Sequence, residues 1–369
     1  MADIQLKNII KQLQEKKKKN DRPPFAVGPI SLSIGDGEFF SILGPSGSGK
    51  TTLLRLVAGL IEPSEGKLFV GGVDVLGKSA EERNFSMVFQ EALLFPHMNV
   101  AENVAFGLKM KKVKKRERMK KAMIMLEKVG LKGYENKQPS ELSGGQQQRV
   151  SLARALVMEP HVLLMDEPFS ALDPELREEM RELVKSIQEE LDTTLLFVTH
   201  DREEAFQLSD RIAIIVDGRV VQVGTPHELY VNPSTIDTAA FLGAKNILQG
   251  YWKEGTFMSE SGSIIFSDKR RGWEAYTACH LILRPELFYP EHAGGHLQRV
   301  IDEKPHKVIR ITGTLTKAAF YQGVHHLKLH VGSIELHAKI QLLDDWHIGE
   351  GDEVTLCYPL SHVILLQDH

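Results

Sequence analysis

The sequence contains few cysteines and no long apolar run. Of its 369 residues only Cys279 and Cys357 are cysteine, and they form no CxxC pair. This argues against a disulfide framework and against a metal site built on thiols, and it fits a reducing compartment. No apolar run approaches the roughly 20 residues that a membrane-spanning helix needs. A membrane role would therefore require a partner protein.

An excess of basic charge is also missing. The chain has 45 Lys and Arg against 49 Asp and Glu, a net charge of −4, which argues against nucleic acid as a partner. Residues 1–19 are polar and lysine-rich and lack the apolar core of a signal peptide. We therefore expect a cytoplasmic protein, and its length predicts two domains.

The pattern of apolar residues changes near residue 240. Over residues 1–240 short apolar runs alternate with amphipathic stretches, which predicts an α/β domain with a mainly parallel sheet. Asp217-Gly218 signals a hairpin between two of the runs. The expected strands are Glu38–Leu43, Phe85–Phe89, Val162–Met165, Leu195–Val198 and Ile212–Val216, and the expected helices include Thr51–Leu60 and Pro174–Leu191.

Residues 244–369 have the pattern of a small all-β domain. Short alternating runs are broken by Gly, Pro and Asp, which predicts a barrel or sandwich. Eleven of the fifteen histidines lie from His280 onward, and His326 and His330 share one strand face. A metal or oxyanion sensor is one interpretation of these histidines, and a plain exposed surface is the favoured one. The alternating runs are Cys279–Leu283, Val308–Leu315, His325–Val331 and Val354–Tyr358.

A glycine-rich loop lies between an expected strand and an expected helix. Glycines let consecutive N–H groups curl around a phosphate, and the helix N-terminus adds partial positive charge. Lys50 can reach the outer phosphates and Thr51 can ligate Mg²⁺. We therefore expect the chain to bind a nucleoside triphosphate through Gly44, Pro45, Ser46, Gly47, Ser48, Gly49, Lys50, Thr51 and Thr52.

Two carboxylates follow the apolar run Val162–Met165. In parallel α/β sheets ligands bind at the carboxyl ends of the strands, so both side chains are expected at the site. Asp166 can hold Mg²⁺ through its water shell. Glu167 points elsewhere and can polarise an attacking water molecule.

A second glycine loop precedes another expected helix. It comprises Ser143, Gly144, Gly145 and Gln146, with Ser143 as a good helix N-cap. This helix N-terminus also suits a phosphate, yet it lies about a hundred residues beyond the first loop. Because one triphosphate has limited room, the second loop is expected to serve a nucleotide held by another copy.

Taken in order, these elements resemble the ATP-binding cassette (ABC) transporter ATPase family over residues 1–240. The resemblance implies a P-loop NTPase fold with a helical subdomain at about 91–155, ATP and Mg²⁺ as ligands, and a homodimer. The matching elements are the phosphate loop, Gln90, Leu142–Gln146, Asp166-Glu167, Ser170-Ala171-Leu172-Asp173 and His200.

The resemblance also implies a role for each matching residue. Gln90 would contact Mg²⁺, beside Thr51 and Asp166, and sense a permease. Ser143 to Gln146 would close on the ATP of the opposite subunit, and Asp173 would communicate across the dimer. Glu167, His200, Gln90 and Lys50 would form the catalytic set, with His200 near the γ-phosphate. The adenine would stack on Leu13 or on Phe25.

The C-terminal region is similar to the regulatory TOBE domain, an OB-like β fold found on ATPases of solute importers. This implies an energy subunit at the cytoplasmic face of the membrane. It would drive separate permease subunits, served indirectly by a periplasmic or lipoprotein solute-binding protein. The cargo is expected to be a polyamine, ferric iron, an oxyanion or a quaternary amine rather than a sugar. The alternative is a soluble relative acting in repair or translation.

Overall fold

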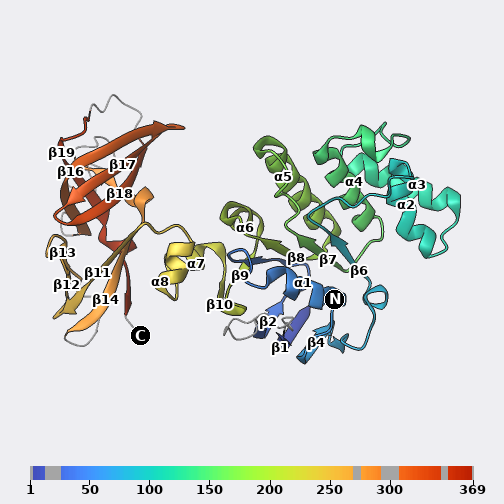
Figure 1. The fold of residues 1–369 in the computed structure, drawn as a ribbon, viewed down its shortest axis with the longest axis horizontal. Coiled ribbons are helices and arrows are strands. Elements are labelled where there is room, and N and C mark those ends of the chain that lie inside the picture. Colours follow the sequence, from blue (N-terminus) through green and yellow to red (C-terminus); the bar gives the residue numbers. More distant parts are fainter. Residues whose placement is uncertain (1–2, 13–25, 269–275, 292–306, 342–347, 368–369) are drawn as a thin grey trace, which may run out of the picture. The chain divides into compact units, whose positions relative to one another are not determined.

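The computed structural model describes residues 3–12, 26–268, 276–291, 307–341 and 348–367. Contacts divide the chain into two units, Met1–Pro226 and His227–His369 (Figure 1). The helices α7 (Pro226–Val231) and α8 (Ile236–Phe241) begin before the sequence-based boundary at residue 240, yet from His227 onward they group with the second unit. The limits of the two folding domains remain a prediction.

A six-stranded sheet forms the centre of the first unit. Its strand order is β10-β9-β3-β8-β7-β6, and all pairs are parallel except β9 with β10. The expected strands and the hairpin are confirmed, and Asp217 and Gly218 both have positive φ at the hairpin turn. The strands are β3 (Phe39–Leu43), β6 (Phe85–Val88), β7 (Val162–Asp166), β8 (Thr194–Thr199), β9 (Arg211–Val216) and β10 (Arg219–Gly224).

A second, antiparallel sheet has the order β2-β1-β4-β5, and the sequence reasoning did not anticipate it. The helix α1 (Lys50–Ala58) buries Leu53, Leu54 and Val57 in an apolar core to which strands of both sheets contribute. This sandwich holds the start of α1 firmly against the end of β3. The strands are β1 (Ile4–Gln12), β2 (Ala26–Ile34), β4 (Glu65–Val70) and β5 (Val73–Asp74).

The remaining helices of the first unit share a separate core with one face of the six-stranded sheet. Of these, α2 to α4 lie together beyond the β6 edge of the sheet in Figure 1. The helices are α2 (Val100–Met110), α3 (Lys115–Lys128), α4 (Gly144–Leu156), α5 (Pro174–Leu191) and α6 (Arg202–Leu208), with short 3₁₀ turns at Ala80–Arg83 and Pro139–Glu141.

The second unit is built on two five-stranded antiparallel sheets in its described residues, which confirms the all-β prediction. Their orders are β13-β12-β11-β14-β20 and β15-β19-β16-β17-β18, and they share one apolar core. The strands are β11 (Asn246–Lys253), β12 (Thr256–Ser259), β13 (Ile265–Ser267), β14 (Thr277–Leu283), β15 (Tyr289–Pro290), β16 (Val308–Tyr321), β17 (Val324–Val331), β18 (Ile334–Gln341), β19 (Glu353–Pro359) and β20 (Ile364–Gln367), with 3₁₀ turns at Pro285–Leu287 and Leu360–His362.

The Asn246 side chain links the two sheets of the second unit. It donates to Leu283 O at 2.9 Å and to His337 O at 2.8 Å, and it accepts from His337 N at 2.7 Å. Asn246 is only 1% exposed, so its side chain makes these bonds from a buried position. One amide therefore fixes β11 and β14 against β18.

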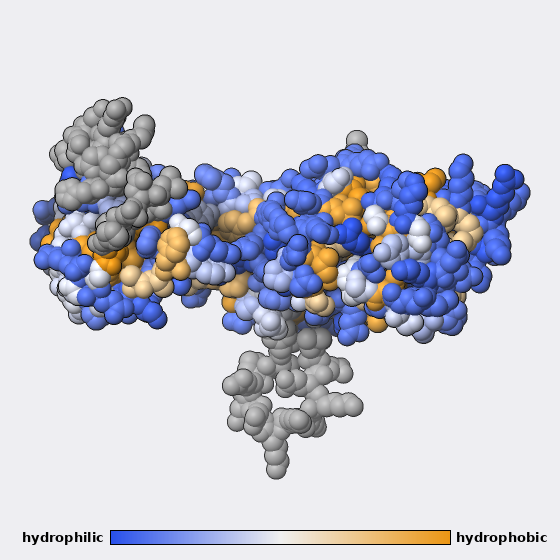
Figure 2. Space-filling view, turned by 90° about the horizontal axis from the view of Figure 1, so that it is seen from above, coloured by the Kyte–Doolittle hydropathy of each residue, from blue (hydrophilic) through white to orange (hydrophobic). Residues whose placement is uncertain are grey.

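Hydrophilic residues cover most of the face shown in Figure 2, and hydrophobic residues lie among them in small groups. None of the helices in the described part of the chain combines the length and the apolar character that crossing a bilayer requires.

Replacing Asn246 with Ala should lower the free energy of unfolding of the second unit by about 1–3 kcal/mol, because buried backbone groups of His337 lose their partners. Urea unfolding followed by tryptophan fluorescence would measure this, since all three tryptophans, Trp252, Trp273 and Trp346, belong to this unit. The same substitution at the exposed Asn232 is the matched control. Equal effects of the two substitutions would contradict a linking role for Asn246.

Candidate active site

The register of the parallel strands brings three polar segments to one edge of the central sheet. Leu43 at the end of β3 pairs with Thr199 at the end of β8, and Asp166 at the end of β7 pairs with Val198. The glycine loop, the two carboxylates and His200 follow these strand ends directly. They therefore emerge side by side, as expected for a ligand site in a parallel sheet.

The glycines of the loop are needed where the backbone comes close to other strands. A Cβ on Gly44 would lie 2.1 Å from Ile215 O, and a Cβ on Gly49 would lie 2.6 Å from Val27 Cγ2. Gly49 also has φ +97°, a conformation that other residues adopt only with strain. The loop is thus packed between β9 and β2, and this packing fixes the curved path of its backbone.

Lys50 is folded into the loop that precedes it. Its ammonium donates to Gly44 O and to Pro45 O, each at 2.9 Å, and the residue is 4% exposed. Burial lowers the Lys50 pKa, and the nearby carboxylates of Glu167 and Asp166 partly restore it. Two of the three ammonium donors are used, so one remains for a ligand oxygen.

Two features of the loop fit a bound phosphate. The Ser48 hydroxyl is buried and has no hydrogen-bond partner among the described residues, which is unusual for a buried polar group. The helix α1 begins after Gly49, which has no side chain to cap the first N–H groups. Uncapped N–H groups at a helix N-terminus favour an anion, and a phosphate would satisfy both features.

Thr51 and Asp166 meet although they are 115 residues apart. Thr51 Oγ1 donates to Asp166 Oδ1 at 2.8 Å, and Asp166 is 7% exposed. Burial raises the pKa of the Asp166 carboxyl, against the lowering effects of the Thr51 hydrogen bond and of Arg55. A hydroxyl and a carboxylate in contact are oxygen ligands of the kind that Mg²⁺ prefers.

Glu167 and His200 form the second polar pair of the site. Glu167 Oε2 lies 2.8 Å from His200 Nδ1, and the two side chains are 19% and 51% exposed. Glu167 has φ +45°, and its N–H donates to Val198 O at 2.9 Å. A partly exposed carboxylate beside a half-exposed imidazole can accept a proton from water.

The structure keeps the second glycine loop apart from the first. Ser143 accepts from Gln146 N at 3.3 Å and caps α4, while Ser143 and Gly144 are exposed. A Cβ on Gly144 would meet nothing within 4 Å. Among the described residues no hydrogen bond or ion pair joins Ser143–Gln146 to the loop Gly44–Thr52.

Gln90 lies in a segment held by α4. Gln148 Nε2 donates to Phe89 O at 3.2 Å, and the Arg154 guanidinium donates to Ala92 O and Leu93 O at 3.0 and 2.9 Å. These bonds grip the backbone on both sides of the exposed Gln90. In the described part of the chain no hydrogen bond links Gln90 to Thr51 or Asp166.

The comparisons with known proteins decide the family. A family model described as ABC transporter matches residues 27–170. The spermidine/putrescine import ATP-binding protein PotA of Mesoplasma florum is 42% identical over 282 residues, which cover 76% of this chain and 80% of that protein. The chain belongs to the ABC transporter family.

Further relatives extend the likeness to both units. The sulfate/thiosulfate import ATP-binding protein CysA 2 of Rhizobium meliloti is 41% identical over 336 residues, 90% of this chain and 87% of that protein. PotA of Thermobifida fusca is 52% identical over 225 residues, 61% of this chain and 59% of that protein. A solved dimeric ATP-binding cassette with ADP and phosphate matches with a TM-score of 0.54 and 33% identity, over 60% of this chain and 98% of that chain.

These matches confirm an ATP-binding subunit of the importer type that hydrolyses ATP. The two candidates for adenine stacking, Leu13 and Phe25, lie outside the described residues. In the described residues no group of three or more His, Cys, Asp or Glu is arranged to hold a metal ion. The structure therefore gives no support to a metal sensor built from the described histidines of the second unit.

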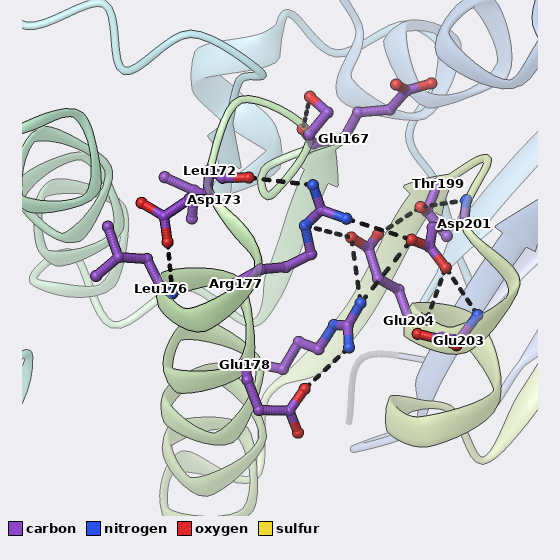
Figure 3. A network of polar contacts seen from close by, with 12 residues as sticks. Glu167, Leu172, Asp173, Leu176, Arg177, Glu178, Thr199, Asp201, Glu203 and Glu204 are labelled. Atoms are coloured by element: carbon purple, nitrogen blue, oxygen red, sulfur yellow. Dashed lines mark hydrogen bonds and ion pairs between the residues drawn. The ribbon is translucent and has the colours of Figure 1, made fainter. Parts of the chain in front are cut away.

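A polar network next to the site joins α5 to α6 in this ABC ATPase (Figure 3). Asp173 caps α5 by accepting from Leu176 N, and Asp201 caps α6 directly after His200. Arg177 donates to Leu172 O at 3.1 Å, and its guanidinium lies 3.6 Å from Asp201 Oδ2. One arginine thus ties the segment that carries Asp173 to the segment that carries His200.

Glu204 is the buried centre of this network. It is 2% exposed, accepts from Thr199 Oγ1 at 2.5 Å, and lies 3.9 Å from the guanidinium of Arg181, which is 6% exposed. Burial raises the pKa of Glu204. Sequence reasoning missed Arg177, Arg181 and Glu204. The i, i+4 spacing of the arginines on the expected helix indicated a shared face but no partner.

Replacing Asp166 with Asn should raise the thermal midpoint of the nucleotide-free protein at pH 7 by about 2–4 °C, the shift expected for ~1 kcal/mol. A raised pKa means that the folded state binds the proton more tightly than the unfolded chain. The ionised Asp166 carboxyl therefore lowers the stability of the folded state once the pH rises above the ordinary pKa of an aspartate. At pH 7 this loss of stability is fully present. The difference from wild type should vanish at acidic pH.

Calorimetric scans of both proteins across pH would measure this effect. The Asn oxygen can still accept from Thr51, so the substitution removes the charge while the contact remains. The same variant should lose the extra stabilisation that Mg²⁺ adds to ATP. A lower midpoint than wild type at pH 7 would show that Asp166 is not a costly buried charge.

Replacing Glu204 with Ala should destabilise the first unit by about 1–3 kcal/mol, because the buried Thr199 hydroxyl loses its acceptor. Arg181 loses one of its carboxylate partners but keeps Glu178 and Asp201. Urea unfolding followed by far-ultraviolet circular dichroism would measure it. The neighbouring Glu203 is exposed, so Glu203→Ala is the control and should change stability by no more than about 0.5 kcal/mol. Similar effects at both positions would rule out the buried network as the cause.

Proposed function

We propose that two copies of this chain hydrolyse Mg-ATP between them and thereby drive import of a small solute through separate permease subunits. The observation that carries the proposal is the separation of the two glycine loops. One phosphate-suited helix end lies among the catalytic groups, and the other is exposed with open space in front of Gly144. A second copy facing the first would bring the two together.

The phosphate loop binds the triphosphate. The backbone N–H groups of the loop Gly44–Thr52, other than Pro45, which has none, and the Ser48 hydroxyl would surround the phosphates. Lys50 would donate to an outer phosphate oxygen. Thr51 and Asp166 would hold Mg²⁺, together with Gln90. When bound, Mg²⁺ neutralises phosphate charge. The cation would then offset the free-energy cost of burying the charged Asp166 carboxylate.

Glu167 and His200 act on the attacking water. The Glu167 carboxylate accepts a proton from the water and orients it toward the γ-phosphate. His200, held 2.8 Å from that carboxylate, keeps Glu167 in place and lies near the γ-phosphate oxygens. Little covalent chemistry is left to the protein in phosphoryl transfer, so positioning and charge stabilisation supply most of the catalysis.

The opposite subunit completes the site. Its Ser143, Gly144, Gly145 and Gln146 would face the γ-phosphate with the N-terminus of α4, and its Asp173 would contact the facing protomer. The solved ATP-binding cassette that this chain resembles is dimeric, which supports the arrangement. In such a dimer each ATP is held by loops from both copies, so hydrolysis can be coupled to opening and closing.

A polyamine is the cargo that we favour. PotA proteins, which are named for spermidine and putrescine, reach 52% identity with this chain. Sulfate is the second candidate, because the CysA relative covers 90% of this chain, including most of the second unit. Either cargo places the protein at the cytoplasmic face of the membrane through its permease, with a solute-binding protein as an indirect partner.

Replacing Glu167 with Gln should lower the rate of ATP hydrolysis by roughly 10²–10⁴-fold, the span expected when a general base is lost. ATP binding should persist, because the phosphate loop is unchanged. With Mg-ATP the variant should therefore accumulate as a particle of twice the protomer mass, measured by light scattering.

The exposed Glu175 offers a matched control, since Glu175→Gln makes the same change near the start of α5. It should hydrolyse ATP at the wild-type rate. Normal hydrolysis by Glu167→Gln would remove Glu167 from its role. A variant that stays a single particle with saturating Mg-ATP, even with its permease present, would overturn the dimer.

A further inference from the structure

A run of basic residues joins α2 to α3 in the first unit. Residues 109–121 contain nine Lys and Arg and a single acid, Glu117. All but two of the nine are exposed, and in the described part of the chain only Lys121 forms an ion pair, with Glu159. Seven positive charges remain once Glu117 and Glu159 are each set against one of the nine. This segment is termed the basic tract, and its basic members are Lys109, Lys111, Lys112, Lys114, Lys115, Arg116, Arg118, Lys120 and Lys121.

At the end of α2 a lysine of the basic tract occupies a position that favours glycine. Lys112 N donates to Lys109 O and Val113 N donates to Leu108 O, both at 3.0 Å. These are the two hydrogen bonds of a Schellman motif, whose left-handed residue is usually glycine. Here that residue is Lys112, with φ +60°. A residue with a Cβ is strained in this conformation, so Lys112 lowers the stability of the helix end.

The start of α3 is equally unfavourable for basic residues. Lys114 is the N-cap and makes no side-chain hydrogen bond to the first turn, where Ser, Thr, Asp or Asn would make one. Lys115 and Arg116 follow in the first turn, and positive charge there opposes the helix dipole. These basic residues therefore lower the stability of their own helix, which indicates a role other than folding.

The basic tract lies at the edge of the central sheet opposite the ATP site (Figure 1). Lys111 Nζ donates to Asn84 Oδ1 at 3.1 Å, directly before β6. Lys121 Nζ lies 3.0 Å from Glu159 Oε1, shortly before β7. The catalytic groups follow the other ends of the parallel strands. A second copy that closes over the ATP site therefore leaves the basic tract free for a different partner.

The chemistry of the basic tract suits a layer of lipid headgroups. Seven of its nine basic residues are lysines, which are flexible point charges and offer no fixed fork for one phosphate. Met110 is 57% exposed and stands between Lys109 and Lys111. An exposed apolar side chain among lysines can enter the boundary between headgroups and acyl chains while the lysines attract phosphate groups. Nucleic acid offers phosphates without an apolar layer, and the net charge of −4 argues against it.

We propose that the basic tract binds anionic phospholipid headgroups at the membrane surface. The inference rests on the proposed function, which places the first unit beside a permease at the membrane. Clusters of about four to eight Lys and Arg next to a bilayer are of the size that binds anionic lipids. The contact would hold the first unit against the bilayer, while the ATP edge of its sheet stays free for a second copy.

Flotation of the full chain with lipid vesicles tests this proposal. Vesicles of phosphatidylcholine and phosphatidylglycerol in a two-to-one ratio should bind the protein, and vesicles of phosphatidylcholine alone should not. Raising the salt from about 0.1 M to about 1 M shortens the screening length from about 10 Å to about 3 Å, so binding should weaken about tenfold or more. Equal binding to both kinds of vesicle, or binding to neither, would overturn the proposal.

A double variant separates lipid binding from folding. Lys112→Asn suits the left-handed position and Lys114→Ser supplies an N-cap, so together they should raise the thermal midpoint of the first unit by about 2–4 °C in calorimetric scans. The same variant should bind the anionic vesicles about 25-fold more weakly, since each basic residue near such a surface contributes roughly fivefold. Unchanged vesicle binding by this variant would refute the assignment.

The pair Lys67→Gln and Lys307→Gln is the matched control. Both lysines are exposed and lie outside the basic tract, and the net charge of the protein changes by the same amount. This control should bind anionic vesicles as wild type does. If it weakened binding as much as the double variant, the attraction would depend on net charge alone and the basic tract would not be the site.

A methionine variant and an RNA competitor distinguish a bilayer from nucleic acid. Met110→Gln should weaken vesicle binding about threefold or more at both salt concentrations, because the apolar contact is lost. Met258→Gln, at a 43% exposed methionine of the second unit, should not weaken it. Short single-stranded RNA at the same phosphate concentration should displace little protein from the vesicles. Saturable RNA binding tighter than vesicle binding would assign the basic tract to nucleic acid and overturn the proposal.

ATP hydrolysis without vesicles keeps this proposal separate from the proposed function. The double variant should hydrolyse ATP at the wild-type rate, because the basic tract lies at the edge of the sheet away from the catalytic groups. A slower rate would contradict that separation. Wild-type hydrolysis with no lipid binding would defeat the lipid proposal alone, whereas normal hydrolysis by Glu167→Gln would defeat the proposed catalysis and leave lipid binding standing.

Discussion

The parallel register of β3, β7 and β8 is the constraint on which the rest of the site depends. Because Leu43 pairs with Thr199 and Asp166 with Val198, three segments far apart in sequence leave the sheet at one edge. A shift of one residue in any of these strands would turn buried side chains toward the site and site residues into the core. The apolar strands thus position the chemistry without taking part in it.

The site gathers charges that the fold alone does not favour. Lys50 and Asp166 are both almost fully buried. Burial lowers the pKa of Lys50 and raises the pKa of Asp166, so it favours the neutral form of each side chain. A triphosphate with its cation supplies the missing opposite charges, so ligand and protein stabilise each other. The network around Glu204 differs, because its arginines supply compensating charge within the chain and so link the segments of Asp173 and His200 without a ligand.

Much of this architecture could be predicted from short stretches of sequence. The apolar runs indicated all five parallel strands, and the glycine loop with Lys50 and Thr51 indicated the phosphate site, because each of these signals is local. The antiparallel sheet of β1, β2, β4 and β5 was missed, since its central pairing of β1 with β4 joins segments more than 50 residues apart. The links from α4 to both sides of Gln90 were missed for the same reason, as backbone carbonyls carry no sequence signal.

The sequence by itself determined which groups are available. These are a loop whose glycines allow close approach of other backbone, two carboxylates after an apolar strand, and a histidine after another strand. Tertiary structure alone decided which of them meet. It placed Thr51 on Asp166 and Glu167 on His200, and left Gly144 facing open space. The physical reason is that motifs depend on neighbours along the chain, whereas strand register and burial depend on residues that are distant in sequence.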